Sequence, residues 1–192
     1  LAGIGRRQYQ VLPRLQVQGL GAYPWRTASG FAGLSVLLWA PSLKRYLNFT
    51  RLCNPRLGED DPLALYQQAL PWASAGSFAQ LAAAHATLSQ AKLSHDGRLS
   101  GSSKTQALLQ APAAAVLESL VERDWTRLVA TLNRQRAQGL AEADPQAGYC
   151  VVQPSAWGKA QFDPTLQVLT LPIYDAQQAE LSLHLPYRPW LQ

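Results

Sequence analysis

Alternating apolar and polar residues characterise the N-terminal part of the chain. In residues 9–18, Leu15 and Val17 alternate with Gln16 and Gln18. Successive side chains of a β-strand point to opposite faces, so this period of two predicts a strand with one buried face. An apolar run at residues 33–40 and an alternating stretch at residues 43–52 flank Pro41 and Ser42. We expect these two stretches to form a β-hairpin, and residues 1–53 to be β-rich.

The middle of the chain, residues 59–139, has the spacing of helices. Asp61 followed by Pro62 predicts an N-cap and a short helix to about Leu70. A second helix is expected from Ser77 to residue 93, through an alanine-rich stretch. Between Pro112 and residue 138, apolar residues recur at steps of three and four, which predicts one long helix. These residues are Val116, Leu117, Leu120, Val121, Trp125, Leu128, Val129 and Leu132.

Strand-like patterns return in residues 148–187. Residues 166–174 and 179–185 are expected to form an antiparallel hairpin around residues 175–178, with Leu181, Leu183 and Leu185 on one face. The order of β-rich, helical and β-rich segments predicts an α+β fold. We expect a single domain over residues 1–192, in which N- and C-terminal strands build one antiparallel or mixed sheet and the helical middle packs on it.

Composition narrows the class of protein. Hydrophobic residues make up 47% of the 192 residues and charged residues 15%, a balance that excludes a disordered chain. The absence of methionine suggests a fragment of a larger protein. We expect no membrane partner, because no apolar stretch is long enough to cross a bilayer. Two cysteines, Cys53 and Cys150, form no disulfide framework, which favours free thiols and a cytoplasmic protein.

The stretch at residues 95–109 resembles a phosphate-binding loop only in its residue types. A P-loop needs four residues between its glycines and a lysine directly after the second glycine, so that backbone N–H groups surround the phosphates. Here three residues separate Gly97 from Gly101, and two serines precede Lys104. We therefore interpret residues 95–97 as a turn between helices, and residues 104–110 as a short helix.

Candidate catalytic residues are few, and no cofactor is expected. No nucleophile motif accompanies His85, His95 or His184. A hydrolase remains one alternative, with a site formed by His95 and the carboxylates of Glu59, Asp60 and Asp61. Those three carboxylates also suit a hard cation, but no second acidic cluster completes such a site.

Charge is distributed unevenly along the chain. Residues 1–58 contain eight basic side chains and no acidic one, whereas the remaining residues contain nine basic and twelve acidic side chains. Aromatic residues interleave with those cations, a mixture typical of surfaces that pair with phosphates and stack on bases. Arg123, Arg127 and Arg134, with Arg136 nearby, are expected to form a second basic stripe on the long helix.

These features favour a non-enzymatic domain that binds DNA or RNA through a basic, aromatic N-terminal β surface. The residues predicted to neutralise phosphates are Arg26, Lys44, Arg45, Arg51 and Arg56, and those predicted to stack on bases are Trp25 and Tyr46. A protein-interaction or assembly module is the main alternative. Its anchors would be Trp72, Trp157 or the C-terminal segment with Tyr187, Arg188 and Trp190, and its partners other subunits or the rest of the parent protein.

Overall fold

The chain divides into two compact units, Leu1–Leu117 and Glu118–Gln192, whereas its sequence predicts one domain. The computed structural model describes residues 8–54, 56, 61–73, 76–137 and 149–188, with backbone only for residues 135–137. Strands predominate over helices in both units. No helix among the described residues is long and apolar enough to cross a membrane.

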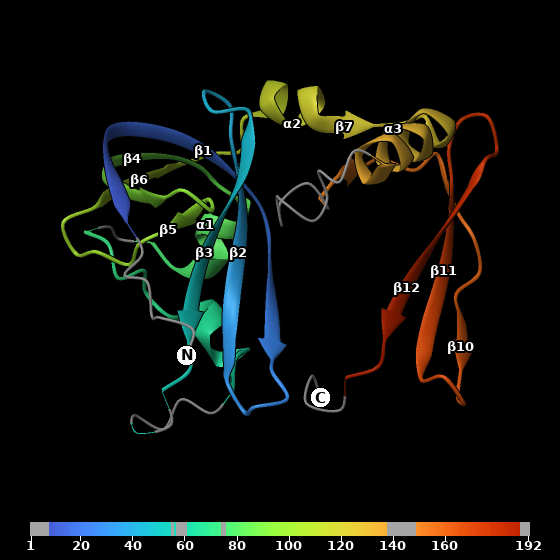
Figure 1. The fold of residues 1–192 in the computed structure, drawn as a ribbon, viewed down its shortest axis with the longest axis horizontal. Helices are drawn as coiled ribbons and strands as arrows, with labels where there is room; N and C mark the ends of the chain where they lie inside the picture. The colour runs from blue at the N-terminus through green and yellow to red at the C-terminus, as the bar shows by residue number, and fades with distance from the viewer. Residues whose placement is uncertain (1–7, 55, 57–60, 74–75, 138–148, 189–192) are drawn as a thin grey trace. The chain divides into compact units, whose positions relative to one another are not determined.

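A closed β-sheet forms the first unit. Its strands are β1 (Tyr9–Arg26), β2 (Ala32–Ala40), β3 (Arg45–Leu52), β4 (His85–Ser94), β5 (Arg98–Leu99) and β6 (Gln106–Gln110). The first half of β1 pairs with β4 and its second half pairs with β2. Since β3 pairs in parallel with β5, and β5 pairs with β4, the order β1-β2-β3-β5-β4 returns to β1. The strands therefore close into a barrel, across which β1 arches in Figure 1.

Two glycines allow β1 to serve both neighbours. The register shifts between Gly19 and Gly21, which marks a β-bulge. A Cβ atom on Gly19 would lie 2.1 Å from the carbonyl oxygen of Leu81, so only glycine lets the strand approach helix α1 (Phe78–Ala83) this closely. The Gly19 N–H donates to the carbonyl of Ala84 at 2.8 Å.

The barrel interior is apolar, as the alternation predicts. Leu34, Val36 and Leu38 of β2 point inward together with Leu47 and Phe49 of β3. Helix α1 contributes Phe78, which stacks on Phe49 with 5.4 Å between ring centroids, and Leu81. The predicted start of this helix at Ser77 is confirmed, because Ser77 and Gln80 form a capping box.

Strand order, the parallel contact of β3 with β5, and a helix between β3 and β4 together give the architecture of an OB fold. Strand β6 follows β5 along the same edge of β4, so the two act as one interrupted fifth strand. Residues 100–105 separate them, and Thr105 anchors this segment by donating its hydroxyl to the carbonyl of Gln90 at 3.1 Å.

The prediction of a helical middle segment is wrong in several places. Helix α1 ends at Ala83, and the expected helical residues from His85 onward form β4. Within β4, Ala86, Leu88, Ala91 and Leu93 point into the core, and pairing with β1 on one edge outweighs the helix propensity of alanine.

Four local predictions have different outcomes. Residues 95–97 do form a turn, but between strands β4 and β5 rather than between helices, and residues 106–110 are strand β6 rather than a helix. Asp61 accepts the N–H of Leu63 at 2.9 Å, and a 3₁₀ helix, η2 (Ala64–Gln67), follows. The hairpin of β2 and β3 is observed as predicted.

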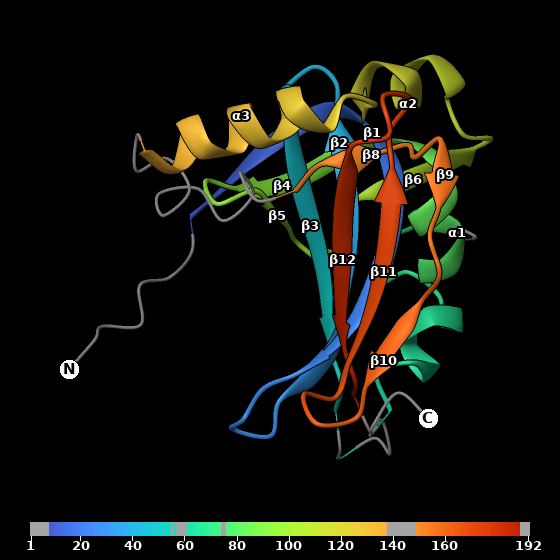
Figure 2. The same cartoon turned by 90° about the vertical axis from the view of Figure 1, so that its right-hand side faces the viewer.

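The second unit is a small antiparallel sheet with a helix packed on it. The strands of this sheet are β9 (Ala156–Trp157), β10 (Gln161–Asp163), β11 (Val168–Tyr174) and β12 (Glu180–Pro186). Strands β7 (Val121–Glu122) and β8 (Val151–Val152) form a separate two-stranded parallel sheet. Helix α3 (Trp125–Ala137) packs Trp125 and Leu128 against Ile173. In both views α3 crosses one end of β11 and β12 (Figures 1 and 2). The predicted hairpin of β11 and β12 is observed.

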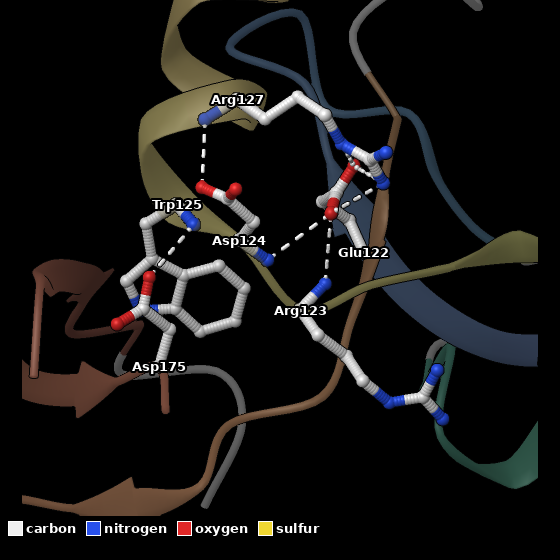
Figure 3. A network of polar contacts seen from close by, with 6 residues as sticks. All are labelled: Glu122, Arg123, Asp124, Trp125, Arg127 and Asp175. Atoms are coloured by element: carbon white, nitrogen blue, oxygen red, sulfur yellow. Dashed lines mark hydrogen bonds and ion pairs between the residues drawn. The ribbon is translucent and has the colours of Figure 1, made fainter. Parts of the chain in front are cut away.

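Two larger predictions fail here. Among the described residues, N- and C-terminal strands do not share a sheet, because β1 pairs with β2 and β4 whereas β11 pairs with β9, β10 and β12. The expected long helix is broken into α2 (Ala114–Leu120), strand β7 and α3. Figure 3 shows why: the Glu122 carboxylate accepts the N–H groups of Arg123 and Asp124, and Asp124 caps α3 by accepting the N–H of Arg127 at 2.9 Å.

Asp175 fixes the start of α3 to the β11–β12 turn. Its carboxylate is buried and accepts the N–H groups of Trp125, Gln177 and Ala179 at 2.9–3.0 Å. Burial alone raises the pKa of Asp175, but these three donors lower it further than burial raises it, so the pKa lies below its ordinary value. The side chain is therefore held as a carboxylate, as drawn beside Trp125 in Figure 3.

Candidate nucleic-acid interface

The outer face of β1, β2 and β3 carries aromatic and small polar side chains in register. Directly paired residues point to the same side of a sheet. One row across the three strands is Tyr23, Ser35 and Thr50. Two rows further along the same face, Trp39 pairs with Tyr46. Their sequence neighbours Leu34, Val36, Leu38 and Leu47 point into the core, so these rows face outward.

Trp25 lies across this face in a fixed orientation. Its Nε1 donates to the Ser35 hydroxyl at 3.1 Å, and that hydroxyl is 2.9 Å from the hydroxyl of Thr50. A Cβ atom on Gly33 would lie 2.8 Å from the Trp25 ring, so the ring packs directly on the glycine backbone. The indole is therefore positioned on the sheet before any ligand arrives.

Three further rings extend the same face. Trp39 and Tyr46 contact each other edge to face, with 5.0 Å between their centroids. Tyr23 is 40% exposed. Trp25 and Tyr46, both predicted as stacking residues, thus lie on one face with Tyr23 and Trp39, and β1, β2 and β3 contain no carboxylate.

The predicted phosphate-neutralising residues lie elsewhere on the barrel. Arg45 and Arg51 lie on the same side of β3 as Leu47 and Phe49, which point into the core. The two arginines are near opposite ends of the strand. Arg26, at the end of β1, and Arg56, after β3, are exposed near the Arg51 end, and Lys44 is exposed in the turn before Arg45. Arg26, Arg45 and Arg51 therefore alternate with the outward-facing residues of their strands, and Lys44 and Arg56 lie outside the strands.

Sequence reasoning missed one cation on the outer face. Arg98 of β5 is in register with Asn48 of β3, whose neighbours on the outer face are Tyr46 and Thr50. The Asn48 Oδ1 atom is buried and has no hydrogen-bond partner among the described residues. A two-residue strand such as β5 is too short to show alternation, so no sequence signal indicated the direction of the Arg98 side chain.

The helical arginines do not form the predicted basic stripe. Arg123 pairs with Glu118 at 2.6 Å. Arg127 pairs with Glu122 at 2.8 Å, as Figure 3 shows. Burial raises the pKa of Glu122, but donation by the Asp124 N–H, the Arg127 side chain and the Arg123 N–H lowers it below its ordinary value. The Arg136 side chain lies outside the described residues.

Charge differs between the two units. Residues 1–117 contain eleven basic and four acidic side chains, a net charge of +7, whereas residues 118–192 contain six basic and eight acidic ones, a net charge of −2. The positive charge of the protein therefore belongs to the barrel, which carries the aromatic face.

The alternative sites have less support in the geometry. His95 borders a hollow whose described lining includes no carboxylate, and Glu59 and Asp60 lie outside the described residues. The described residues contain no cluster of three or more metal-ligating side chains. Cys53 and Cys150 form no disulfide with each other, in line with the sequence prediction.

The interaction anchors differ in their exposure. Trp72 is only 3% exposed and donates its Nε1 to the Ser100 carbonyl at 2.8 Å, so it is a core residue and not an interface anchor. Trp157 is 65% exposed and Tyr187 is 41% exposed. Arg188 is exposed as well, and Trp190 lies outside the described residues.

Comparisons with known proteins identify no family. No family model matches this chain, and no curated protein matches it. One solved structure, described as "Molecular basis for abrogation of activation of pro-inflammatory cytokines", is similar to 97% of this chain and 82% of its own, with 12% sequence identity and a TM-score of 0.37. A similarity at this level carries no argument about fold or function.

Proposed function

We propose that this protein binds single-stranded nucleic acid across the outer face of β1, β2 and β3. The observation that carries the proposal is the set of four rings on that face: Tyr23, Trp25, Trp39 and Tyr46. In OB folds the face of strands 2 and 3 is the usual place where oligonucleotides bind. Fold alone does not establish function, so the proposal rests on the side chains present there.

The chemistry of the face suits unpaired bases. Stacking of a base on an aromatic side chain contributes about 1–3 kcal/mol and tolerates any base, because every base has a π face. Such stacking needs bases that are free of a duplex, which favours single strands over double-stranded DNA. The absence of carboxylates on β1–β3, together with a net charge of +7 on residues 1–117, reduces electrostatic repulsion of a phosphate backbone.

A matched pair of tyrosines tests the proposal. Tyr23 on the outer face and Tyr66 in η2 have similar exposure, 40% and 37%, but only Tyr23 belongs to the proposed interface. We expect Tyr23→Ala to weaken binding of a fluorescein-labelled oligothymidylate by about 5- to 100-fold, the range that loss of one stacked base implies. Fluorescence anisotropy at low ionic strength measures the two affinities.

The control variant Tyr66→Ala should bind as the wild type does. Failure of the wild-type protein to bind any single-stranded oligonucleotide at low salt would reject the proposal. Equal losses in Tyr23→Ala and Tyr66→Ala would reject the assignment of the face. A preference for duplex over single strands of the same sequence would also contradict the stacking mechanism.

An exposed apolar strip favours a protein-interaction module as the second candidate function. In the second unit Leu166 is 70% exposed, Leu185 52% and Phe162 51%, and Phe162 contacts Tyr187 edge to face at 6.5 Å. Helix α3 packs on Ile173 at the other end of this sheet and leaves the strip uncovered by the described residues of its own unit. Sedimentation analysis of the wild type and of Phe162→Ser/Leu185→Ser tests it: self-association abolished by the double variant supports this candidate, and a monomeric wild type argues against self-assembly.

A further inference from the structure

A hollow with mixed polar and apolar walls lies at one end of the barrel. It has a volume of about 630 Å³ and is bordered by the start of β1, the β2–β3 turn and the β4–β5 turn. Leu12, Leu43 and Leu93 supply its apolar surface, and Tyr9, Arg45 and His95 supply polar groups. Pockets of roughly 300–1,000 Å³ with apolar walls and a few convergent polar groups are typical ligand sites.

Arg45 is oriented at this hollow by the fold. Arg45 is the first residue of β3 and lies on the same side of the strand as Leu47. Its side chain therefore lies at the end of the barrel and not on the outer face. Its Nη2 atom donates to the carbonyl of His95 at 3.3 Å, and this contact ties the guanidinium to the β4–β5 turn. A guanidinium has five N–H donors in a planar fork, and this contact uses one of them.

The surroundings of Arg45 favour an anion. No carboxylate is among the described residues that line the hollow. Asp96, which follows the lining residue His95 in sequence, accepts a hydrogen bond from the hydroxyl of Ser94. Lys44 precedes Arg45 and is exposed, which adds a second positive charge at the rim. Guanidinium groups bind phosphate oxygens with two parallel hydrogen bonds, a geometry that lysine does not provide.

We propose that this hollow binds a phosphomonoester attached to a ring, with the phosphate on Arg45 and the ring against Leu12, Leu43 and Leu93. A nucleoside 5′-monophosphate and the 5′-phosphorylated end of a nucleic-acid strand share this chemistry. The described lining of the hollow includes none of the four rings of the aromatic face, so the inference does not depend on the proposed function. The proposal also gives a role to Arg45, whose side chain lies on the opposite side of β3 from the aromatic face.

Calorimetric titration of the full chain with AMP tests this site. We expect AMP to bind, adenosine to bind at least about 10-fold more weakly, and Arg45→Gln to weaken AMP binding by about 10- to 100-fold, because charge-assisted hydrogen bonds are lost. Lys104→Gln is the matched control, because Lys104 is exposed in the segment between β5 and β6. This variant should bind AMP as the wild type does. Circular dichroism verifies that each variant is folded.

A second variant keeps the test valid if Arg45→Gln does not fold. Leu43 is 39% exposed in the β2–β3 turn, so Leu43→Glu places a negative charge beside the hollow without disturbing the core, and it should also weaken AMP binding. Undetectable AMP binding by the wild type, equal affinities for AMP and adenosine, or unchanged AMP binding in the folded variant would overturn the proposal.

Short oligonucleotides distinguish the two sources of the ligand. If pTpT binds more tightly than both TpT and AMP, and Arg45→Gln removes the difference, the natural ligand is a phosphorylated strand end. If AMP binds more tightly than pTpT, it is a free nucleotide. A loss of AMP binding in Tyr23→Ala would mean that AMP binds on the aromatic face and not in the hollow.

Discussion

Single residues decide how the aromatic face is presented. Glycine at position 33 permits Trp25 to lie flat on β2, and the hydroxyl of Ser35 orients the indole through its Nε1 atom. The ring is thereby held in one orientation before binding. Preorganisation of this kind reduces the entropy that a ligand loses by ordering side chains.

Substitution of Gly33 tests the importance of this packing. A Cβ atom there would lie 2.4 Å from the carbonyl oxygen of Arg51 as well as 2.8 Å from Trp25. We expect Gly33→Ala to destabilise the protein by about 1–3 kcal/mol, the usual cost of overpacking, and to alter tryptophan fluorescence. Urea denaturation measures the change. Gly101→Ala is the control, because its Cβ would meet Pro71 at an ordinary 3.4 Å and should change stability little.

At the scale of elements, the sequence is most informative where local pattern and tertiary environment agree. The hairpins β2–β3 and β11–β12 follow from alternation on either side of turn residues, and α1 begins at the predicted cap. Strand β4 could not be predicted, because alanine-rich sequence favours a helix locally and only pairing with β1 and β6 makes it a strand.

The break between α2 and α3 illustrates the same limit. Apolar residues continue at helical spacing through residues 116–132, so periodicity indicated a single helix. The carboxylates of Glu122 and Asp124 accept backbone N–H groups, and a new helix begins at Trp125. In the sequence, the only sign of this break is Asp124, a residue type that favours helix N-caps, inside an apolar pattern. Among the candidate site residues, the side of β3 on which Tyr46 lies follows from the alternation in residues 43–52, but the bulge in β1 that brings Tyr23 and Trp25 onto the same face needed the structure.

The cap at Asp124 can be tested directly. Because its carboxylate accepts the Arg127 N–H, Asp124→Ala should lower the free energy of unfolding by about 0.5–2 kcal/mol. Asp124→Asn keeps a capping oxygen and should restore most of that loss. Chemical denaturation followed by circular dichroism compares the variants. If Asp124→Ala is as stable as the wild type, α3 does not depend on this cap.

At the scale of the whole molecule, the separation of charge predicts how binding responds to salt. Each phosphate neutralised on a single strand contributes about −0.7 to the slope of log affinity against log salt concentration. Arg98 lies on the outer face, in register with Asn48, whereas Arg134 is an exposed residue of α3 in the second unit. Arg98→Gln should therefore make the slope shallower by about 0.7, and Arg134→Gln should leave it unchanged.

Anisotropy titrations of a labelled single strand over a range of salt concentrations measure these slopes. Equal slopes for the wild type and Arg98→Gln would show that Arg98 contacts no phosphate. A change of slope in Arg134→Gln instead would assign the electrostatic contact to the second unit.

The shortness of β5 has a mechanical consequence for the barrel. Only two residue pairs join β3 to β5, whereas β2 joins β3 through eight. Local opening of a protein begins where fewest hydrogen bonds must break together. The pairing of β3 with β5 is therefore the place where the barrel opens most easily, while its other strand pairings stay intact. Opening there would change the curvature of the sheet that carries the aromatic face.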